Sequence, residues 1–303
     1  MVEIKDTVKN LVNSKIEVDL TICIKCEACV RECPLRLYYI RENKLVMRRL
    51  TDIACMECGH CLAVCPVDAI KLKNFPIENI VEITEEFDVP TYDMFLNLIK
   101  LRRSVRQFKQ QPIPEDIWNK LIEAGRLAPT GHNDQLIHFT IVRNQELLEK
   151  FSNEITRGFK ELSVLYEDLK KRSQVKSIVP KEFRELVKGV LQGFKDTLKG
   201  IERGEEFWRW RGEIIIIHAL KKTSSLAQDC SLAASNIMLA AETLGLGTCS
   251  LGLATAAINL FESVANIVNL PKTHVAAYSL AVGFPKVKYF RIPARQSAKV
   301  TWF

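Results

Sequence analysis

Eight of the ten cysteines of this 303-residue chain lie between Cys23 and Cys65, and their spacing restricts the fold of that region more than any other feature. They form two copies of the pattern C-x2-C-x2-C-x3-C-P, the first ending at Pro34 and the second at Pro66. Each cysteine of the first copy has a counterpart at one constant offset in the second, as Cys23 has in Cys55, which predicts a pseudo-twofold pair. Three thiolates at successive spacings of three can surround one corner of a metal cluster, whereas the fourth is carried away from them.

Two other uses of cysteine compete with a cluster. A disulfide framework would spread cysteines through a small secreted domain, but residues 1–22 contain no apolar core of signal-peptide length. Zinc sites with four cysteine ligands also use C-x2-C. They usually consist of C-x2-C pairs separated by a longer loop, and they do not need three closely spaced cysteines followed by C-x3-C-P. Zinc and disulfides stay open as the less favoured alternatives.

Over residues 15–72 the two copies resemble the bacterial-type ferredoxin that holds two 4Fe–4S clusters. The resemblance implies one-electron transfer and two ligand sets, in which the fourth cysteine of each copy serves the other cluster. The first set is Cys23, Cys26, Cys29 and Cys65, and the second is Cys55, Cys58, Cys61 and Cys33. Between the copies, Tyr38–Ile40 and Leu45–Met47 are predicted to form a hairpin.

Cysteine content falls sharply after the second copy, and only Cys230 and Cys249 lie between Tyr92 and the end of the sequence. We therefore predict a ferredoxin domain over 1–75, a linker over 76–92 and a second domain over 93–303. A short strand is expected in the linker near Ile80–Ile83.

Helices and strands are interleaved along the second domain, which favours an α+β fold. We expect three helices, through Phe95–Leu101, from Pro114 onward and over Leu226–Leu244. Strands are expected over His138–Val142, Ile214–Ile217 and Val275–Val282. The charged segment 145–211 is expected to be largely helical.

Four segments of the second domain carry residues suited to a phosphate and a flat redox ring. Arg102, Arg103, Ser104 and Arg106 place three guanidinium groups and a hydroxyl in five residues, and such donors suit a phosphate. The segment 128–135 presents polar amides, and 245–252 is rich in glycines that let the backbone approach a flat ligand. The segment 283–285 reads Gly-Phe-Pro and is followed by further arginines.

Taken together and in this order, the four segments resemble the nitroreductase family of FMN-dependent oxidoreductases over residues 93–303. The resemblance implies a three-layer α-β-α domain with a mixed, mostly antiparallel sheet, placed after the small ferredoxin-like domain. It also implies FMN as cofactor and a homodimer with FMN at the interface between subunits.

The resemblance assigns roles to individual residues. Arg102, Ser104 and Arg106 would hold the FMN phosphate and ribityl chain with Arg103 beside them, and Arg295 or else Arg291 would add a second phosphate contact. Asn133 would bond the flavin ring in a motif that ends at Gln135, and Pro129 and Thr130 would lie against the ring from the partner subunit. Ser250, Leu251 and Gly252 would direct backbone N–H groups at the ring, and His132 is a candidate proton donor.

The combination predicts an FMN-dependent reductase that receives electrons through two clusters and reduces small electrophiles such as nitroaromatics or quinones. NAD(P)H at the flavin, and a redox partner such as reduced ferredoxin acting through the clusters, are both candidate donors. Two alternatives are an electron relay to a partner protein and another reaction of the family, such as reductive dehalogenation.

Composition excludes several other classes. The chain is 47% hydrophobic and 26% charged with a formal net charge of +7, which is ordinary for a globular protein. No stretch reaches the ~18 uninterrupted apolar residues of a membrane span, and Arg48-Arg49 is too short a basic run to indicate nucleic acid. We therefore expect a cytoplasmic protein without a membrane or nucleic-acid partner.

Overall fold

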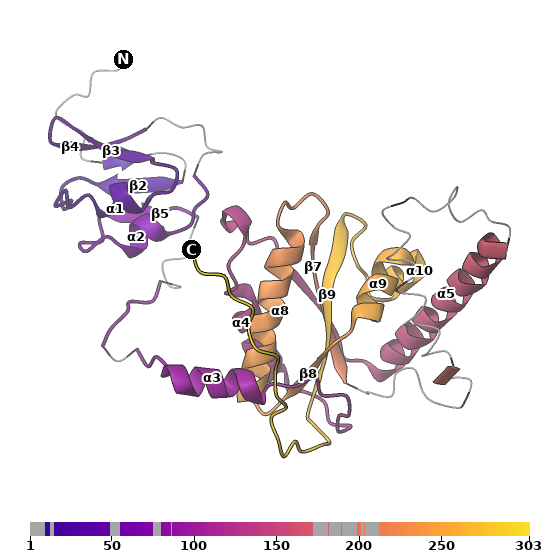
Figure 1. The fold of residues 1–303 in the computed structure, drawn as a ribbon. Helices are drawn as coiled ribbons and strands as arrows, with labels where there is room; N and C mark the ends of the chain where they lie inside the picture. Colours follow the sequence, from indigo (N-terminus) through magenta and orange to yellow (C-terminus); the bar gives the residue numbers. More distant parts are fainter. Residues whose placement is uncertain are drawn as a thin grey trace. The chain divides into compact units, whose positions relative to one another are not determined.

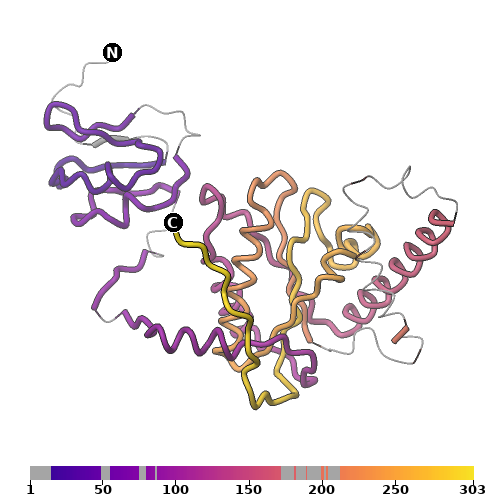
Figure 2. Tube along the Cα trace, in the orientation of Figure 1, coloured from indigo at the N-terminus to yellow at the C-terminus, as the bar shows by residue number. Residues whose placement is uncertain are grey.

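The computed structural model describes residues 10–12, 15–48, 55–74, 80–85, 87–171 and 212–303, with single positions at 181, 189, 199, 200 and 203. The chain forms two units, shown in Figures 1 and 2. The first comprises Met1–Val89 with His132–Asp134, and the second comprises Pro90–Gly131 with Gln135–Phe303.

The first unit contains short strands and two short helices. Its elements are β1 (Asn10–Val12), β2 (Ile16–Asp19), α1 (Ala28–Glu32), β3 (Tyr38–Arg41), β4 (Lys44–Met47), α2 (His60–Ala63) and β5 (Ile70–Leu72). Strands β1, β2 and β5 form one antiparallel sheet in that order, and β3 pairs with β4 in an antiparallel hairpin. The predicted hairpin between the cysteine copies is therefore confirmed.

The second unit contains a four-stranded sheet with helices on both faces (Figure 1). Its elements are α3 (Tyr92–Leu101), α4 (Glu115–Arg126), β6 (His138–Val142), α5 (Gln145–Lys171), β7 (Glu213–Leu220), α8 (Leu226–Thr243), β8 (Gly247–Ser250), α9 (Gly252–Leu260), α10 (Glu262–Ile267) and β9 (His274–Gly283). The strand order is β6-β7-β9-β8, and each neighbouring pair is antiparallel.

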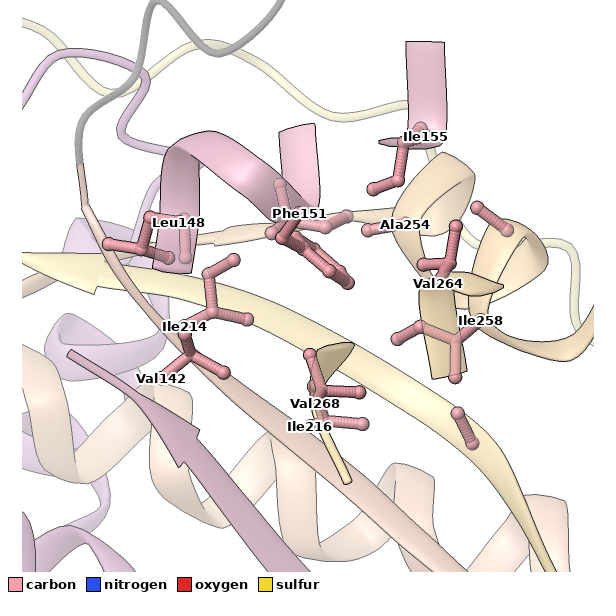
Figure 3. Close-up of a cluster of buried hydrophobic side chains, with 14 of the residues drawn as sticks. Val142, Leu148, Phe151, Ile155, Ile214, Ile216, Ala254, Ile258, Val264 and Val268 are labelled. Carbon is pink, nitrogen blue, oxygen red and sulfur yellow. The ribbon is translucent and has the colours of Figure 1, made fainter. Parts of the chain in front are cut away.

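Strand β7 lies inside the sheet and contributes to both hydrophobic cores. Its four consecutive isoleucines at 214–217 are all fully buried, and successive side chains of a strand point to opposite faces. Ile214 and Ile216 join a cluster with α5, α9 and α10 (Figure 3), whereas Ile215 and Ile217 join a cluster with α4 and α8. This double burial produces the predicted three-layer architecture.

A buried carboxylate connects α4 to the sheet. Glu213 accepts hydrogen bonds from the backbone N–H of Ile113 at 2.8 Å, from Nε1 of Trp118 at 2.7 Å and from Nε of Arg143 at 3.1 Å. Arg143 also donates to the carbonyl of Ile113. A buried charge is tolerated when hydrogen bonds and a counter-charge surround it, and this one holds the start of α4 against β7.

Two expectations need comment. The strand expected at Ile80–Ile83 is wrong, because residues 80–83 have no regular structure and Ile83 is 89% exposed, so a strand there would bury nothing. The helical segment expected over 145–211 is a helix as far as Lys171, and most of its remainder lies outside the described residues. Within the described part of the chain, no helix is long and apolar enough to cross a membrane.

Three histidines from neighbouring strands meet on one face of the sheet. His218 is 3% exposed, its Nδ1 lies 2.8 Å from Nδ1 of His274, and its Nε2 lies 3.0 Å from Oγ1 of Thr140. The ring of His138 lies 5.6 Å from that of His218, centroid to centroid. Burial, with the two neighbouring imidazoles, lowers the pKa of His218 from 6.5 to about 4. The His218 ring is therefore neutral at pH 7.

His218 should make the second unit sensitive to acid. Its folded pKa lies below the unfolded value, so the unfolded state binds more protons and the free energy of unfolding falls as the pH drops from 6.5 to about 4. The expected loss is on the order of 2–3 kcal/mol. Urea unfolding across this range should show a shallower pH dependence for His218→Gln than for the unaltered chain. Equal slopes would contradict the assignment.

Candidate cluster and flavin sites

The eight cysteines of the repeat surround two separate cavities in the first unit. The first cavity is lined by Cys23, Cys26, Cys29 and Cys65, and the second by Cys33, Cys55, Cys58 and Cys61. Each grouping joins three cysteines of one copy with the fourth cysteine of the other. The structure thus brings together the same residues as the crossed ligand sets, while their binding of iron stays a prediction.

The backbone repeats along with the cysteines. Lys25 and Glu57, which occupy equivalent positions in the two copies, have φ values of 58° and 49°. Glu27 and Gly59 are a second equivalent pair, with φ values of 62° and 78°, and they immediately precede α1 and α2. A left-handed residue other than glycine costs about 1–2 kcal/mol, so these turns are imposed by the surrounding structure. They fold the three closely spaced cysteines of each copy around their cavity.

Backbone N–H groups donate hydrogen bonds to sulfurs of both copies. Leu37 donates to Sγ of Cys33 at 3.4 Å, and its counterpart Ala69 donates to Sγ of Cys65 at 3.3 Å. Glu57 donates to Sγ of Cys55 at 3.4 Å. Such bonds favour the thiolate that a metal requires.

Burial acts in the opposite direction on the free thiols. It raises the pKa of Cys29 to about 11 and also raises the pKa values of Cys55 and Cys61. A positively charged iron core would overcome this effect, and its binding would release protons. The sulfur donors, the apolar walls and the N–H groups together fit a buried iron–sulfur cluster.

Zinc would place a different demand on the same cysteines. A single zinc ion requires four sulfurs at about 2.3 Å from one centre. Among the described residues, no three Cys, His, Asp or Glu side chains converge closely enough to hold one metal ion.

In the second unit, the arginine-rich segment lies along the edge of the sheet. Ser104 forms a parallel bridge with Thr248 of β8, and the N–H of Val105 donates to the Thr248 carbonyl at 2.9 Å. Gly247 permits this approach, because a Cβ there would lie 2.4 Å from Cγ2 of Val105. Two arginines of this segment lie close enough to titratable groups to affect their pKa values. Burial raises the pKa of Cys249, and Arg106 opposes that rise. Burial likewise raises the pKa of Glu242, and Arg102 opposes that rise.

The corner after β9 closes over the same segment. The N–H of Lys109 donates to the Phe284 carbonyl at 2.8 Å, and the N–H of Lys286 donates to the Gln107 carbonyl at 2.9 Å. Tyr289 donates through its hydroxyl to the carbonyl of Ser104 at 3.4 Å. Three of the four predicted segments therefore meet, although they are far apart in sequence.

Part of the segment 245–252 is already hydrogen-bonded within the sheet. The N–H of Leu251 already donates to the carbonyl of Ser279 at 2.9 Å, so the expectation that it points at a flavin ring is wrong. Gly252 is the first residue of α9, where backbone N–H groups have no partner within the helix. The hydroxyl of Ser250 lies 2.8 Å from that of Tyr278. The place of Tyr278 beside Ser250 could not be predicted from local sequence, because it depends on the register of two strands. The sequence signal that points to such a residue is an aromatic hydroxyl on a strand that borders a glycine-rich segment.

The second-unit residues of the remaining segment, 128–131 and 135, lie elsewhere within that unit. The N–H of Gly131 donates to Asp229 at 3.1 Å in the first turn of α8, whereas Arg102 acts on Glu242 in its last turn. Asp229 and Glu242 are 13 residues apart on this helix, which corresponds to about 20 Å along its axis. The N–H of Gln135 donates to the hydroxyl of Thr130 at 3.1 Å, and Pro129 is exposed. Within one chain, residues 128–131 and 135 are thus separated from the other three segments.

The remaining predicted residues lie in several different surroundings. Asn133 belongs with the first unit and donates through Nδ2 to the carbonyls of Glu57 at 3.0 Å and Met56 at 3.4 Å. His132 is exposed and has a φ of 54°. Arg291 and Arg295 lie exposed in the C-terminal segment, and Arg103 is half-buried. The roles of these residues stay predictions.

A three-layer domain with an arginine-rich segment bound to a glycine-rich sheet edge, preceded by two cysteine cavities, defines the class of protein. A profile of the nitroreductase family matches residues 99–284, and one of the 4Fe–4S dicluster domain matches residues 8–83. The first match spans more than half of the sequence, and the chain belongs to the nitroreductase family.

Relatives connect the chain to named proteins. A protein of Methanothermobacter thermautotrophicus, named an NADH dehydrogenase/NAD(P)H nitroreductase, is 34% identical over 71 residues, which are 23% of this chain and 37% of the relative. The chain thus spans little more than a third of that relative's length. A ferredoxin of Methanocaldococcus jannaschii is 35% identical over 60 residues, which are 19% of this chain and 94% of that protein. The second alignment shows a ferredoxin domain.

Solved structures agree on the fold. A nitroreductase with bound FMN from Bacteroides fragilis superimposes with a TM-score of 0.50 and 24% identity, covering 69% of this chain and 97% of that one. A nitroreductase with bound FMN from Desulfitobacterium hafniense also gives 0.50, with 19% identity and the same coverage of 69% and 97%.

Gly247→Ala should destabilise the second unit. The added methyl group would collide with Val105, and overpacking of this kind costs about 1–3 kcal/mol. Gly252→Ala is the matched control, because the space around that position is open. Thermal unfolding followed by circular dichroism measures both. Equal melting temperatures for the two variants would show that the segment tolerates displacement from β8.

Proposed function

We propose that this protein is an FMN-dependent oxidoreductase that receives electrons through two 4Fe–4S clusters and reduces small electrophiles such as nitroaromatics or quinones. A ferredoxin domain over 1–75 would hold the clusters, a linker over 76–92 would follow, and the domain over 93–303 would hold FMN. The observation that carries the proposal is the occurrence, in one chain, of two cavities lined by four cysteines each and three converging segments of a nitroreductase-family domain.

The converging segments offer the groups that an FMN phosphate requires. Arg102, Arg103, Ser104 and Arg106 supply charge and donors on one backbone segment, and Arg291 or Arg295 would add a cation from the C-terminal side. Gly252 would offer a backbone N–H group at the start of α9, beside the Ser250–Tyr278 hydroxyl pair. When bound, FMN supplies two-electron chemistry that the clusters alone lack.

A second copy of the chain would complete the site. Pro129, Thr130 and Gln135 lie away from the other three segments of the second unit, so we infer that they, with Asn133 of the same motif, serve the FMN of the partner subunit. Helix α3 supports a dimer because none of its residues is buried, and Tyr92, Met94 and Leu101 are each more than half exposed. The C-terminal segment likewise exposes Phe290 and Trp302. Apolar surface of this extent marks an interaction site.

Electrons would enter from NAD(P)H or from a carrier such as reduced ferredoxin. The names of relatives from Methanothermobacter and Archaeoglobus include NAD(P)H, which supports the nucleotide. The cysteine cavities support the protein carrier, because clusters exchange single electrons with such partners.

Arg102→Ala should weaken FMN binding by about tenfold to a hundredfold, because one charged hydrogen bond to phosphate is lost. The cluster absorbance of the same sample should not change. Arg157→Ala on α5 is the control, since it removes an identical charge from an exposed pairing with Glu154 and Glu161. Flavin fluorescence after filtration gives the affinity. Equal FMN retention in both variants would rule out Arg102 as a phosphate ligand.

The activity itself is tested by anaerobic steady-state assays of the purified full chain. NADH, NADPH and reduced ferredoxin should each be paired with nitroaromatic, quinone and halogenated acceptors. Turnover of a nitroaromatic or quinone is the expected result. Reduction of clusters and flavin without turnover of any small acceptor would instead indicate a relay, and turnover of halogenated acceptors alone would indicate dehalogenation. Zinc in place of iron, with no flavin, would overturn the proposal.

A further inference from the structure

Tyr38 presents a buried hydroxyl to the second cysteine cavity. The residue is 2% exposed at the start of β3, and its hydroxyl has no hydrogen-bond partner in the described protein. Its side chain lines the cavity together with Cys33, Cys55, Cys58 and Cys61. An unsatisfied buried polar group costs about 1–3 kcal/mol, so a native structure rarely leaves one without an acceptor.

The internal repeat supplies a comparison for this residue. At the offset that relates Cys33 to Cys65, the counterpart of Tyr38 is Ile70. Ile70 lines the first cavity, where Cys65 also lies, so the two side chains occupy equivalent places. The backbone bonds to Cys33 and Cys65 are alike, at 3.4 and 3.3 Å, whereas one cavity receives a phenol and the other a hydrocarbon.

The acceptor available to the hydroxyl is sulfur. Tyr38 and Cys61 line the same cavity and belong to the same buried core cluster of the first unit. Glu57, which also lines the cavity, is already held by Lys15 at 2.9 Å and by Asn74 at 2.8 Å. The sulfurs of the second set therefore remain for the phenol.

We infer that the Tyr38 hydroxyl donates a hydrogen bond to the sulfurs of the second cluster and raises its reduction potential, an effect that the first cluster lacks. The inference rests on the ligand sets of the proposed function. Reduction adds one negative charge to the cluster, and a hydrogen bond to sulfur stabilises that charge. The low dielectric of the cavity strengthens the bond.

Other charges also differ between the two loops. Lys25 occupies the place that Glu57 takes in the second copy, and Glu57 is paired with Lys15. Lys25 is exposed, so solvent and salt screen its charge. These charges contribute to the absolute potential of each cluster. The effect of the buried hydroxyl is therefore measured as a shift within the second cluster.

Tyr38→Phe isolates this effect, because it removes one oxygen atom and keeps the ring that fills the core. The anaerobically purified full chain should be titrated with reductant while the paramagnetic signals of both clusters are recorded. One of the two midpoints should fall and the other should stay. Loss of the hydrogen bond should lower the equilibrium constant for reduction of the second cluster about tenfold. This corresponds to a fall of about 59 mV in its midpoint potential for a one-electron couple.

Tyr39→Phe is the matched control, because neighbouring residues of a strand point to opposite faces. It should leave both midpoints unchanged. A second readout is an exchangeable proton coupled to one cluster in the unaltered chain, which Tyr38→Phe should abolish. Two unshifted midpoints, or an equal shift of both, would overturn the inference. A chain that holds iron and sulfide for fewer than two clusters would instead overturn the ligand sets.

Discussion

Close contact with the main chain of the sheet positions the arginine-rich segment of the second unit. Two glycines, which have no side chain, make this contact possible. Gly247 and Gly283 lie where this segment crosses the end of the sheet, and Val105 and Phe108 fill the space that their side chains would take. Main-chain bonds from Val105 and Lys109 then fix the segment near both ends. Because β8 and β9 pair directly with each other, the start of α9 and the hydroxyl of Tyr278 are positioned on the same frame.

The first unit depends on a different constraint, the need to keep sulfur in apolar surroundings. Its core contains few large side chains beyond Tyr38 and the aliphatic residues of β2 and β5, and Cys29 and Cys61 are part of it. Burial raises the pKa values of both thiols, so this core favours protonated sulfur until a metal binds. Cluster assembly would therefore be coupled to folding in this domain.

Sequence predicted those features whose partners are set by a local pattern or by the internal repeat. The resemblance to a two-cluster ferredoxin implied the grouping of Cys33 and Cys65 with the opposite copies, and a run of isoleucines predicted β7. Features that depend on register were missed. Strand β8 was expected only as a glycine-rich loop, and the N–H of Leu251 turned out to be used by Ser279. Trp118 bonds to Glu213, which is far away in the sequence, and no local pattern encodes such a distance.

A duplicated domain also separates what both cavities share from what only one of them has. The cysteines and their left-handed turns recur in both copies, because every cluster of this kind makes the same demands on geometry. A difference between the cavities must therefore come from residues that are not ligands. Tyr38 and Ile70 are such a pair, since they have the same place on the backbone and different chemistry. Ligand spacing indicates which cofactor a domain binds, whereas the side chains that break the repeat determine how its two sites differ.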